Sequence, residues 1–480
     1  MSGIEPLTGI GGIMLTHAVG HRPGPIPLGY ALAAGAVVLW ASFDTLRLRW
    51  RRARLDPAVG RPVPQRMQAL LDGAIVRWVI RTIGLLATAA VVVLARNEPA
   101  DPENPAIALV YVVFWVGLPV SALLLGPVWR TLNPLRTAHL ILNRLVARDP
   151  RHGLLALPER YGYWPAAVGL FAFAWLELVS PDRLNPRWML AWWVGYAVLM
   201  LLGALLFGSP WFDRGDPFEA YSALVALLAP WGRRATDRRI VLRNPLHGLA
   251  GLVPAPGLRA LVAVLLAATG FDALSGTSWW HALKAESALP VLLGTAGLLA
   301  VVLLALGSFW LAGWLTGQLA DRPGRQISQQ IAHSLVPIAV GYVLAHYLTL
   351  LITAGPEAIQ HAVTALNPLS GEFGQAATDA ASNHAGHHNQ VGHTMVMPAE
   401  PTGVADPAPG STPAGWPGPI AASVIEVSAV LGGHLVGIIA AHDRLLHLLP
   451  GGRRGVIAQV PLLICMIGYT FAALVLLSAR

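Results

Sequence analysis

Long apolar stretches, separated by short polar loops, run along almost the whole chain. A helix needs about 20 mostly apolar residues to cross a lipid bilayer, and ten stretches approach that length. The pattern predicts an all-α fold, a polytopic transmembrane helical bundle of about ten spans. The predicted spans are Ile26–Phe43, Ile75–Leu94, Ala106–Gly126, Trp164–Val179, Trp188–Gly208, Leu258–Leu274, Leu289–Gly317, Ile331–Ala354, Ile420–His442 and Ile457–Ser478.

Two shorter apolar stretches and one proline refine this prediction. Pro134–Val146 and Phe218–Trp231 have helical apolar spacing but are too short to span, so we expect both to lie along the inner face. Pro337 is expected to kink or loosen the eighth span, because proline removes a backbone hydrogen bond. No internal repeat or pair of inverted halves is evident, which disfavours a standard secondary transporter.

The composition is that of a membrane protein. Of 480 residues, 55% are hydrophobic and 12% are charged, against about 25% charged in ordinary soluble domains. With ten spans, the arginine-rich loops fall on one side, which is cytoplasmic because positively charged loops stay inside. Both termini are then outside, and the net charge of +8 reflects topology and not nucleic-acid binding. The preference for arginine over lysine favours a bacterial source and therefore the bacterial cell (plasma) membrane.

This topology divides the chain into four regions. Residues 1–25 form an outer N-terminal arm, and residues 26–354 hold transmembrane helices 1–8 with basic cytoplasmic loops. Residues 355–419 form an outer loop rich in histidine, proline and glycine, a composition typical of disorder. Residues 420–480 hold transmembrane helices 9 and 10.

The outer loop contains the string "HAGHHNQVGHTMVM", which concentrates imidazole and thioether groups. Thioether sulfur selects Cu(I), whereas imidazole also suits Cu(II), zinc and nickel. The spacing matches no structural zinc pattern, so the tract is either a metal-capture segment or a polar loop whose histidines have no role. The candidate outer ligands are His384, His387, His388, His393, Met395 and Met397, together with His17 and His21 of the N-terminal arm.

Ionisable groups inside apolar spans are costly in lipid and usually face a partner, a cavity or a cofactor. The eighth and ninth predicted spans contain the candidate metal or proton relay. Helical rise places one histidine and one glutamate at a similar depth in the outer half, so a hydrogen-bonded pair is expected between them. The relay candidates are His346 and Glu426, which form this pair, with His434, His333 and His442.

Alternatives remain open for these groups. Helix rotation prevents Glu426, His434 and His442 from sharing one face, so a lone histidine is either a relay group or a structural hydrogen-bonding group. His333 and His442 are expected near the inner boundary. Gly432 and Gly433, beside His434, allow close helix approach. Two other acids, Glu177 and Asp272, fall near the outer ends of their spans, where position alone explains them.

Several distinctive strings resemble a known family. They are "VYVVFWVGLPVSALLLGPVWRTLNPLR", "LPERYGYWPAAVGLFAFAWLELV", "DPFEAYSALVALLAPWGRR", "IAHSLVPIAVGYVLAHYLTLL" and "GHLVGIIAAHDRLL". From about Ala106 onward the chain is similar to bacterial, largely actinobacterial, integral membrane proteins named fenitrothion hydrolase. The resemblance implies a polytopic membrane fold and hydrolysis of an organophosphate ester, and it transfers no catalytic residues. The long outer histidine loop departs from the family pattern.

Three functions follow as hypotheses. The first is a membrane protein that handles or translocates a metal cation of the copper type, or a proton, through the eighth and ninth helices. The second is a membrane-embedded, metal-dependent phosphotriester hydrolase that uses the same residues. The third is a haem or quinone redox protein with histidine ligands. The expected cofactor is a transition metal, copper or zinc, before haem, and the expected partners are the lipid bilayer and a metal ion or lipophilic small molecule.

Overall fold

The computed structural model describes residues 28–97, 99, 103–367 and 419–478. Within these residues, nine helical segments are long and apolar enough to cross a membrane. They are α2 (Leu28–Arg49), α4 (Ala74–Asn97), α5–η1–α6 (Pro105–Leu125), α10 (Pro186–Phe207), α14 (Leu258–Ser275), α16 (Pro290–Ala320), η4–α18 (Ala332–Leu366), α20 (Pro419–Leu448) and α21–α22 (Arg453–Ile457 and Val460–Ser478). The chain is therefore an all-α, multi-pass membrane protein.

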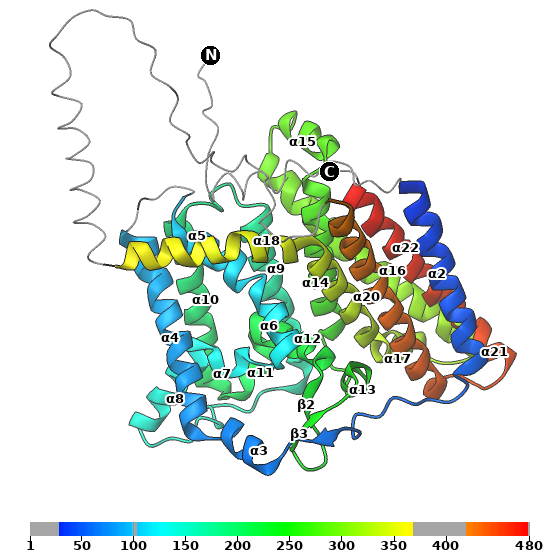
Figure 1. Cartoon of the computed structure of the whole chain (residues 1–480), viewed down its shortest axis with the longest axis horizontal. Helices are drawn as coiled ribbons and strands as arrows, with labels where there is room; N and C mark the ends of the chain where they lie inside the picture. Colours follow the sequence, from blue (N-terminus) through cyan, green and yellow to red (C-terminus); the bar gives the residue numbers. More distant parts are fainter. Residues whose placement is uncertain (1–27, 98, 100–102, 368–418, 479–480) are drawn as a thin grey trace, which may run out of the picture.

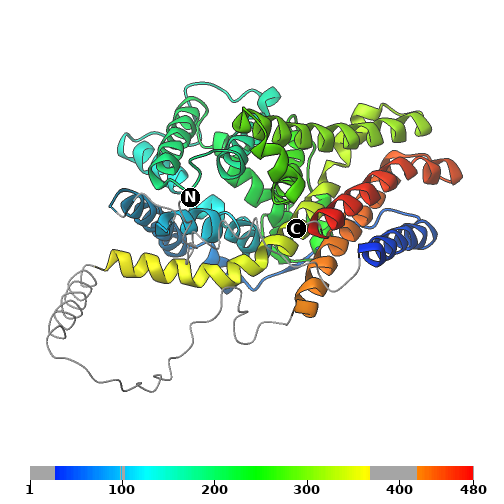
Figure 2. The same cartoon turned by 90° about the horizontal axis from the view of Figure 1, so that it is seen from above.

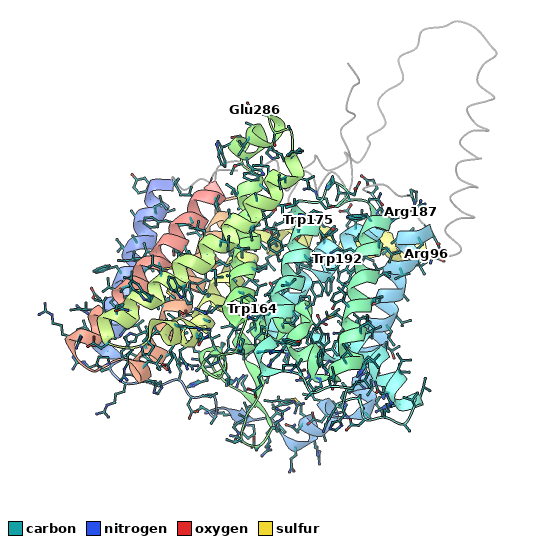
Figure 3. The ribbon with its side chains drawn as sticks, turned by 180° about the vertical axis from the view of Figure 1, so that it is seen from behind. Arg96, Trp164, Trp175, Arg187, Trp192 and Glu286 are labelled. Carbon is teal, nitrogen blue, oxygen red and sulfur yellow. The ribbon has the colours of Figure 1, made fainter. Side chains whose placement is uncertain are left out.

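The fourth predicted span is α9 (Trp164–Leu178), whose 15 residues make it shorter than the others. It still runs lengthwise through the bundle, since Figure 3 shows Trp164 and Trp175 at different heights. With α9 included, the start of α2 and the end of α22 lie at the same end of the bundle (Figure 1). Every predicted span coincides with a helix, and among the described residues nine of these ten segments, all but α9, are long and apolar enough to cross a membrane.

Lipid-facing surfaces explain why whole helices remain apolar. Only 17% of the most apolar window of α4 and of α10 is buried inside the protein, and only 22% of that of α16. Large apolar side chains such as Leu199, Leu303 and Leu304 are exposed on them. In contrast, 67% of the corresponding window is buried in α14 and in η4–α18. These two helices form the centre of the bundle.

Short elements cover the ends of the bundle. Most lie at the end that the charge pattern assigns to the cytoplasm, and α15 (Ser278–Ala285) lies at the opposite end (Figure 1). The strands form a small antiparallel sheet in the order β1-β3-β2, with Arg61 and Trp231 both paired to Leu242. The remaining short elements are β1 (Arg61–Pro62), α3 (Gln65–Leu71), α7 (Trp129–Leu132), α8 (Pro134–Leu145), η2 (Glu159–Tyr161), α11 (Pro210–Gly215), α12 (Pro217–Val225), η3 (Ala226–Leu228), β2 (Trp231–Arg233), β3 (Ile240–Leu242), α13 (Pro245–Ala250) and α17 (Gly324–Gln330).

Helix α18 (Val336–Leu366) differs from the predicted eighth span in two ways. Pro337 occupies the first turn of α18, after the 3-10 turn η4 (Ala332–Leu335), so it starts the α-helix and does not kink its interior. The helix also continues to Leu366, into the region assigned to the outer loop. In Figures 1 and 2 its second half extends sideways over α5 and α4, against which it packs.

Helix α12 corrects the prediction that Phe218–Trp231 lies along the inner face. All but one of the residues from Pro217 to Val225 are buried, and α12 packs against α6, α7, α9 and α18. The reason is its composition, since α12 has too few polar residues to present a broad polar face to water. Its two polar residues near the start, Asp216 and Glu219, are carried into the interior with it.

The structure reveals a local repeat that the apolar pattern did not show. Residues 122–136 read "ALLLGPVWRTLNPLR" and residues 204–219 read "ALLFGSPWFDRGDPFE". In each copy a long helix ends at a glycine with positive φ, Gly126 (85°) or Gly208 (72°). A short helix follows, and then an Asx-Pro pair starts the next helix. The two copies, α6–α7–α8 and α10–α11–α12, thus share one local design.

The caps of the two copies are equivalent as well. The Asn133 side chain accepts hydrogen bonds from the amides of Leu135 and Arg136, which starts α8. The Asp216 side chain accepts them from Phe218 and Glu219, which starts α12. Each cap satisfies amides that have no partner within the helix. The two cap side chains then meet each other, because Asn133 Nδ2 donates to Asp216 Oδ2 at 2.7 Å.

Glycines bring α18 and α20 into close contact. A Cβ added at Gly433 would lie 2.5 Å from the Pro337 carbonyl oxygen, and one at Gly341 would lie 2.5 Å from that of Ala429. This confirms close approach at Gly433. A Cβ at Gly432 would meet nothing within 4 Å, so the same expectation for Gly432 was wrong. Small residues at helix crossings favour such packing in membranes.

Candidate functional site

The outer half of the bundle brings an acid, an imidazole and a phenol together from two helices. Asp272 lies in the last turn of α14, and His346 and Tyr347 are neighbours in α18. His346 Nε2 lies 3.1 Å from Asp272 Oδ2, and the Tyr347 hydroxyl donates to the same oxygen at 2.7 Å. The two rings lie edge to face, with centroids 4.6 Å apart. We call these three residues the outer cluster.

The outer cluster is open at one side. The side chain of His346 is 6% exposed, whereas that of Asp272 is 24% exposed. A hydrogen bond between a carboxylate and an imidazole fixes the ring orientation and stabilises a proton held between them. His346 is therefore the enclosed member of the cluster, and Asp272 is its partly exposed member.

A second acid, Glu177 of α9, lies beside this cluster. It interacts electrostatically with Asp272 and with Arg183, and it approaches the Trp115 indole. Helices α9 and α14 pack directly against each other. Both Glu177 and Asp272 were predicted to lie near the outer ends of their spans. Both acids do lie in the last turns of their helices, and the structure adds that they are within electrostatic reach of each other.

The helix that faces Glu177 is irregular at this depth. Residues Leu109–Phe114 form the π-helix η1 between α5 (Pro105–Ala108) and α6 (Gly117–Leu125). Such widened turns are rare and often accompany functional sites. Tyr111 of η1 donates its hydroxyl to the Arg183 carbonyl at 3.1 Å, and the Trp115 ring packs against Phe173 with centroids 4.8 Å apart. The irregular turn thus directs aromatic polar side chains toward α9.

His346 was expected to pair with Glu426 of α20. The hydrogen bond and ion pair that the structure assigns to His346 join it to Asp272 of α14. Glu426 lies near the outer end of α20 and is partly buried. Glu426 was expected as the partner because it lies at a similar depth in the membrane. The rotation of α18 about its axis instead directs the His346 side chain to Asp272 of α14.

The two inner histidines bond to separate partners. His333 Nδ1 lies 3.0 Å from the Gln330 carbonyl oxygen, and its Nε2 lies 3.2 Å from that of Ala440. His442 Nδ1 lies 2.7 Å from Gln459 Oε1, and its Nε2 lies 3.0 Å from the Trp50 carbonyl oxygen. Both residues lie near the inner end of α20, as expected, and their contacts explain them as structural groups.

His434 lies between these levels and is only 1% exposed. Its Nδ1 lies 2.9 Å from the Val430 carbonyl oxygen one turn earlier. Its Nε2 is buried and has no hydrogen-bond partner among the described residues. Their contacts thus assign His434, His333 and His442 to separate surroundings.

Residues next to His442 fasten several loops to the inner end of α20. Asp443, which is 3% exposed, accepts hydrogen bonds from the Trp50 indole at 2.8 Å and from the Arg54 amide at 2.7 Å. Arg444 donates to the Ala250 carbonyl at 2.6 Å. Asp443 and Arg444 are not among the residues predicted from the sequence, although their adjacency to His442 in "AAHDR" was a usable signal. They hold the chain after α2 and the chain after α13 against the bundle.

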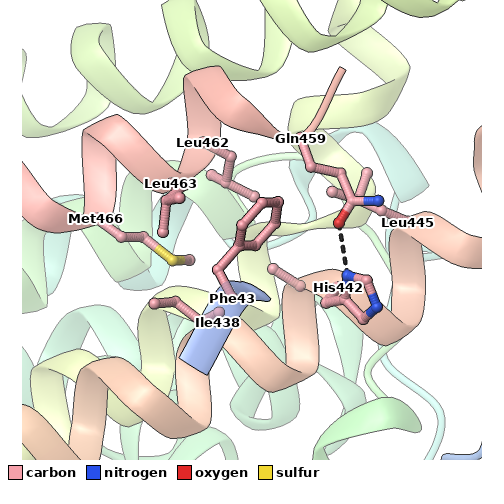
Figure 4. A pocket seen from close by; sticks show the side chains of 9 residues that line it. Phe43, Ile438, His442, Leu445, Gln459, Leu462, Leu463 and Met466 are labelled. Atoms are coloured by element: carbon pink, nitrogen blue, oxygen red, sulfur yellow. Dashed lines mark hydrogen bonds between the residues drawn. The ribbon is translucent and has the colours of Figure 1, made fainter. Parts of the chain in front are cut away.

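A small cavity of about 10 Å³ lies beside His442 (Figure 4). Phe43, Leu463 and Met466 contribute apolar walls. Gln459 and His442 form the polar end of the cavity, where Gln459 Oε1 accepts a hydrogen bond from His442 Nδ1. This volume is at the lower limit for one water molecule. The cavity is therefore too small for a substrate, and it does not mark a catalytic site.

The predicted outer ligands fall outside the part of the chain that the structure describes. They are His17, His21, His384, His387, His388, His393, Met395 and Met397. Among residues 28–97, 99, 103–367 and 419–478, no three histidine, cysteine or acidic side chains are grouped as metal ligands. The described part of the chain therefore offers a His–Asp–Tyr cluster as its candidate site.

Comparison of the chain with protein-family models, with curated proteins and with solved structures finds no match in any of the three.

Proposed function

We propose that this multi-pass membrane protein moves protons, either alone or coupled to a cargo, through the outer cluster of Asp272, His346 and Tyr347. The observation that carries the proposal is the shared Asp272 oxygen, which binds both the imidazole and the phenol. Imidazole changes its charge near neutral pH, and intramembrane groups of this kind mark proton relays in pumps and transporters. Of the two expected cargoes, metal cation or proton, the geometry favours the proton.

Burial supports the same conclusion. The three groups lie among apolar helices, where an unpaired charge is expensive. Glu177 adds a second carboxylate within electrostatic reach of Asp272. Two acids close together compete for protons, so a proton that reaches one is stabilised by the other. The arrangement offers a proton more than one position, at His346, at Asp272 and at Glu177.

A metal ion remains part of the proposal as a cargo. The outer histidine and methionine string suits copper or zinc, and it follows α18, the helix that carries His346. In this scheme the outer loop collects the ion, and protons moving through the outer cluster drive its transfer. Membership of the fenitrothion-hydrolase-like family and a plasma-membrane location are proposed on the quoted sequence strings and on the charge pattern.

Proton flux into proteoliposomes tests this function. The full chain is reconstituted around a pH-sensitive dye, and a potassium diffusion potential of either sign supplies the driving force. We expect the H346A and D272N variants to reduce the initial flux by about tenfold or more, which is within the usual range for a lost acid–base group. The matched control is H281A, since His281 is an exposed histidine on α15. No flux in the wild type with or without a gradient of copper or zinc, or equal flux in H346A and the wild type, would overturn the proposal.

The same pair of residues favours a second candidate function, a phosphotriester hydrolase. A carboxylate that orients an imidazole is the arrangement of a general base that activates water, and lipophilic triesters would reach it from the bilayer. Release of a chromogenic aryl leaving group from a phosphotriester, with and without added zinc, tests this candidate. Turnover in the wild type that D272N abolishes would support it, and the absence of turnover would remove it.

A further inference from the structure

The two repeat copies enclose a set of charged side chains on the inner side of the bundle. Arg136 of α8 forms a two-pronged ion pair with Glu219 of α12, with its Nε 3.0 Å from Oε2 and its Nη2 2.6 Å from Oε1. The same Nη2 lies 2.8 Å from Asp213 Oδ1, which Arg130 also contacts at 2.9 Å. We define the inner ionic cluster as Arg130, Asn133, Arg136, Asp213, Asp216 and Glu219.

Exposure decreases along the inner ionic cluster from the surface to the interior. The side chain of Arg130 is 53% exposed and that of Asp213 is 39% exposed, whereas that of Glu219 is 4% exposed. Asp216 is fully buried. The cluster is therefore reached from the inner surface at Arg130 and Asp213, and it ends in a buried carboxylate.

Asp216 has hydrogen bonds but no cation of its own. It accepts from the amides of Phe218 at 2.9 Å and Glu219 at 3.2 Å, and from Asn133 Nδ2 at 2.7 Å. The same Asn133 nitrogen lies 3.5 Å from Glu219 Oε2. One amide group thus bridges two buried carboxylates, and both guanidinium groups are already bonded to Asp213 and Glu219.

The charges in the cluster do not balance. Three carboxylates, Asp213, Asp216 and Glu219, face two guanidinium groups, Arg130 and Arg136. One negative charge is left over in the set, and it is least favourable on the two buried carboxylates, Asp216 and Glu219. A proton is the smallest cation that can remove it. Burial accordingly raises the pKa of both Asp216 and Glu219 above the ordinary carboxyl values.

Other charged and titratable groups around the cluster are held elsewhere. Arg81 of α4 and Arg144 of α8 lie over the Trp78 ring, and Arg214 of α11 lies over the Tyr163 ring before α9. His139 of α8 packs on Phe212, and burial lowers its pKa. Within the described residues, none of these groups forms an ion pair with Asp216 or Glu219.

Tyr196 of α10 supplies an observation independent of the carboxylates. Its hydroxyl is buried and has no hydrogen-bond partner within the described part of the chain. Its hydroxyl nevertheless lies close enough to interact with the Asp216 carboxylate, and it is within electrostatic reach of Glu219. A buried phenol beside two carboxylates can donate to Asp216 when that acid is ionised and accept from it when it is protonated.

We propose that the inner ionic cluster binds one exchangeable proton, held between Asp216 and Glu219 and taken up from the inner surface beside Asp213. The acids keep their bonds to Arg136 and Asn133 in both states, so only the proton moves. Helix α12 connects this site with the outer cluster, since Tyr221 packs on Trp115 with centroids 5.4 Å apart and interacts with Glu177. The part of the inner ionic cluster in proton movement rests on the proposed function, whereas proton binding by the cluster does not.

Infrared difference spectroscopy of the purified full chain tests proton binding without any transport. The carboxylic acid C=O stretch is measured while the pH is changed. We expect the D216N variant to lose one such band, because two carboxylates then balance two guanidinium groups. The double variant N133D/D216N exchanges the two cap residues between the repeats and restores three carboxylates. We expect it to regain the band.

A third variant keeps the test decisive if D216N does not fold. Arg130 is half-exposed, so R130Q should fold, and loss of its charge should move the band's titration to higher pH. The D272N variant is the control, since Asp272 belongs to the outer cluster. An unchanged band in D216N, or an unchanged titration in R130Q, would overturn the inference.

The infrared and flux experiments separate this inference from the proposed function. A wild type with this band but no proton flux would overturn only the proposed function, and flux without the band would overturn only this inference.

Discussion

His346 of α18 and Asp272 of α14 share a 3.1 Å contact between side chains that are 74 residues apart in the sequence. Tyr347 adds a second hydrogen bond to the same oxygen. The contact links the two most buried helices of the bundle, because α14 and η4–α18 have the largest buried share of their apolar windows. The candidate site therefore also holds two central helices together. Variants at this site should be tested for protein stability as well as for proton movement.

Replacing Asp272 by alanine should destabilise the protein more than replacing it by asparagine. Alanine removes the acceptor for both His346 and Tyr347, and loss of a buried hydrogen-bond partner costs about 1–3 kcal/mol. Asparagine keeps an oxygen that accepts from Tyr347 and removes only the charge. Thermal unfolding of the detergent-solubilised protein measures the difference, with E286A on the exposed end of α15 as control. Equal unfolding temperatures for D272A and the wild type would contradict the described contact.

Two adjacent glycines should respond oppositely to alanine. In G433A the new methyl group would meet the Pro337 carbonyl oxygen at 2.5 Å, so α18 and α20 must separate. Overpacking of this kind costs about 1–3 kcal/mol. In G432A nothing lies within 4 Å of the new atom, and alanine favours the helix over glycine by up to about 1 kcal/mol. Unfolding temperatures of the two variants, measured side by side, check the order, and a less stable G432A would refute it.

Loss of Arg136 should be among the most damaging single changes on the inner side. R136A leaves Glu219 buried without its two-pronged partner, and breaking a buried ion pair from one side costs about 3–5 kcal/mol. R136K should recover only part of the loss, since an ammonium group cannot match the fork of the guanidinium. The double variant R136M/E219M should be more stable than R136A, because both charges are gone. The yield of monodisperse protein and its unfolding temperature report the order.

Stability should fall as the pH rises through the neutral range. Asp216 and Glu219 have raised pKa values in the folded state, so the folded protein holds a proton that the unfolded chain has released. The stabilisation is complete below the ordinary carboxyl pKa and is lost as the pH passes the raised values. Unfolding temperatures between about pH 5 and about pH 8 should therefore decline less in D216N than in the wild type. A steeper decline in D216N would contradict the sign of the shift.

The positions of the apolar helices could be read from the sequence. Each of the ten predicted apolar stretches is a helix in the structure, including the short α9. Bilayer thickness sets the length of a span, and exclusion of positive charge from the outer side sets its direction. Both are properties of local composition. The Asx-Pro strings before α8 and α12 were equally local signals, and comparing them would have revealed the repeat.

The partner of each polar group could not be read in this way. Depth placed His346 beside Glu426, but the rotation of α18 about its axis directs it to Asp272. The apolar spacing of α12 suggested an inner surface helix, but its packing among α6, α9 and α18 buries it with Asp216 and Glu219. The sequence alone determined which segments cross the bilayer, because that depends on transfer of each segment from water to lipid. Which side chains meet inside was decided only by the tertiary structure, because helix rotation and close approach depend on packing between segments distant in the chain.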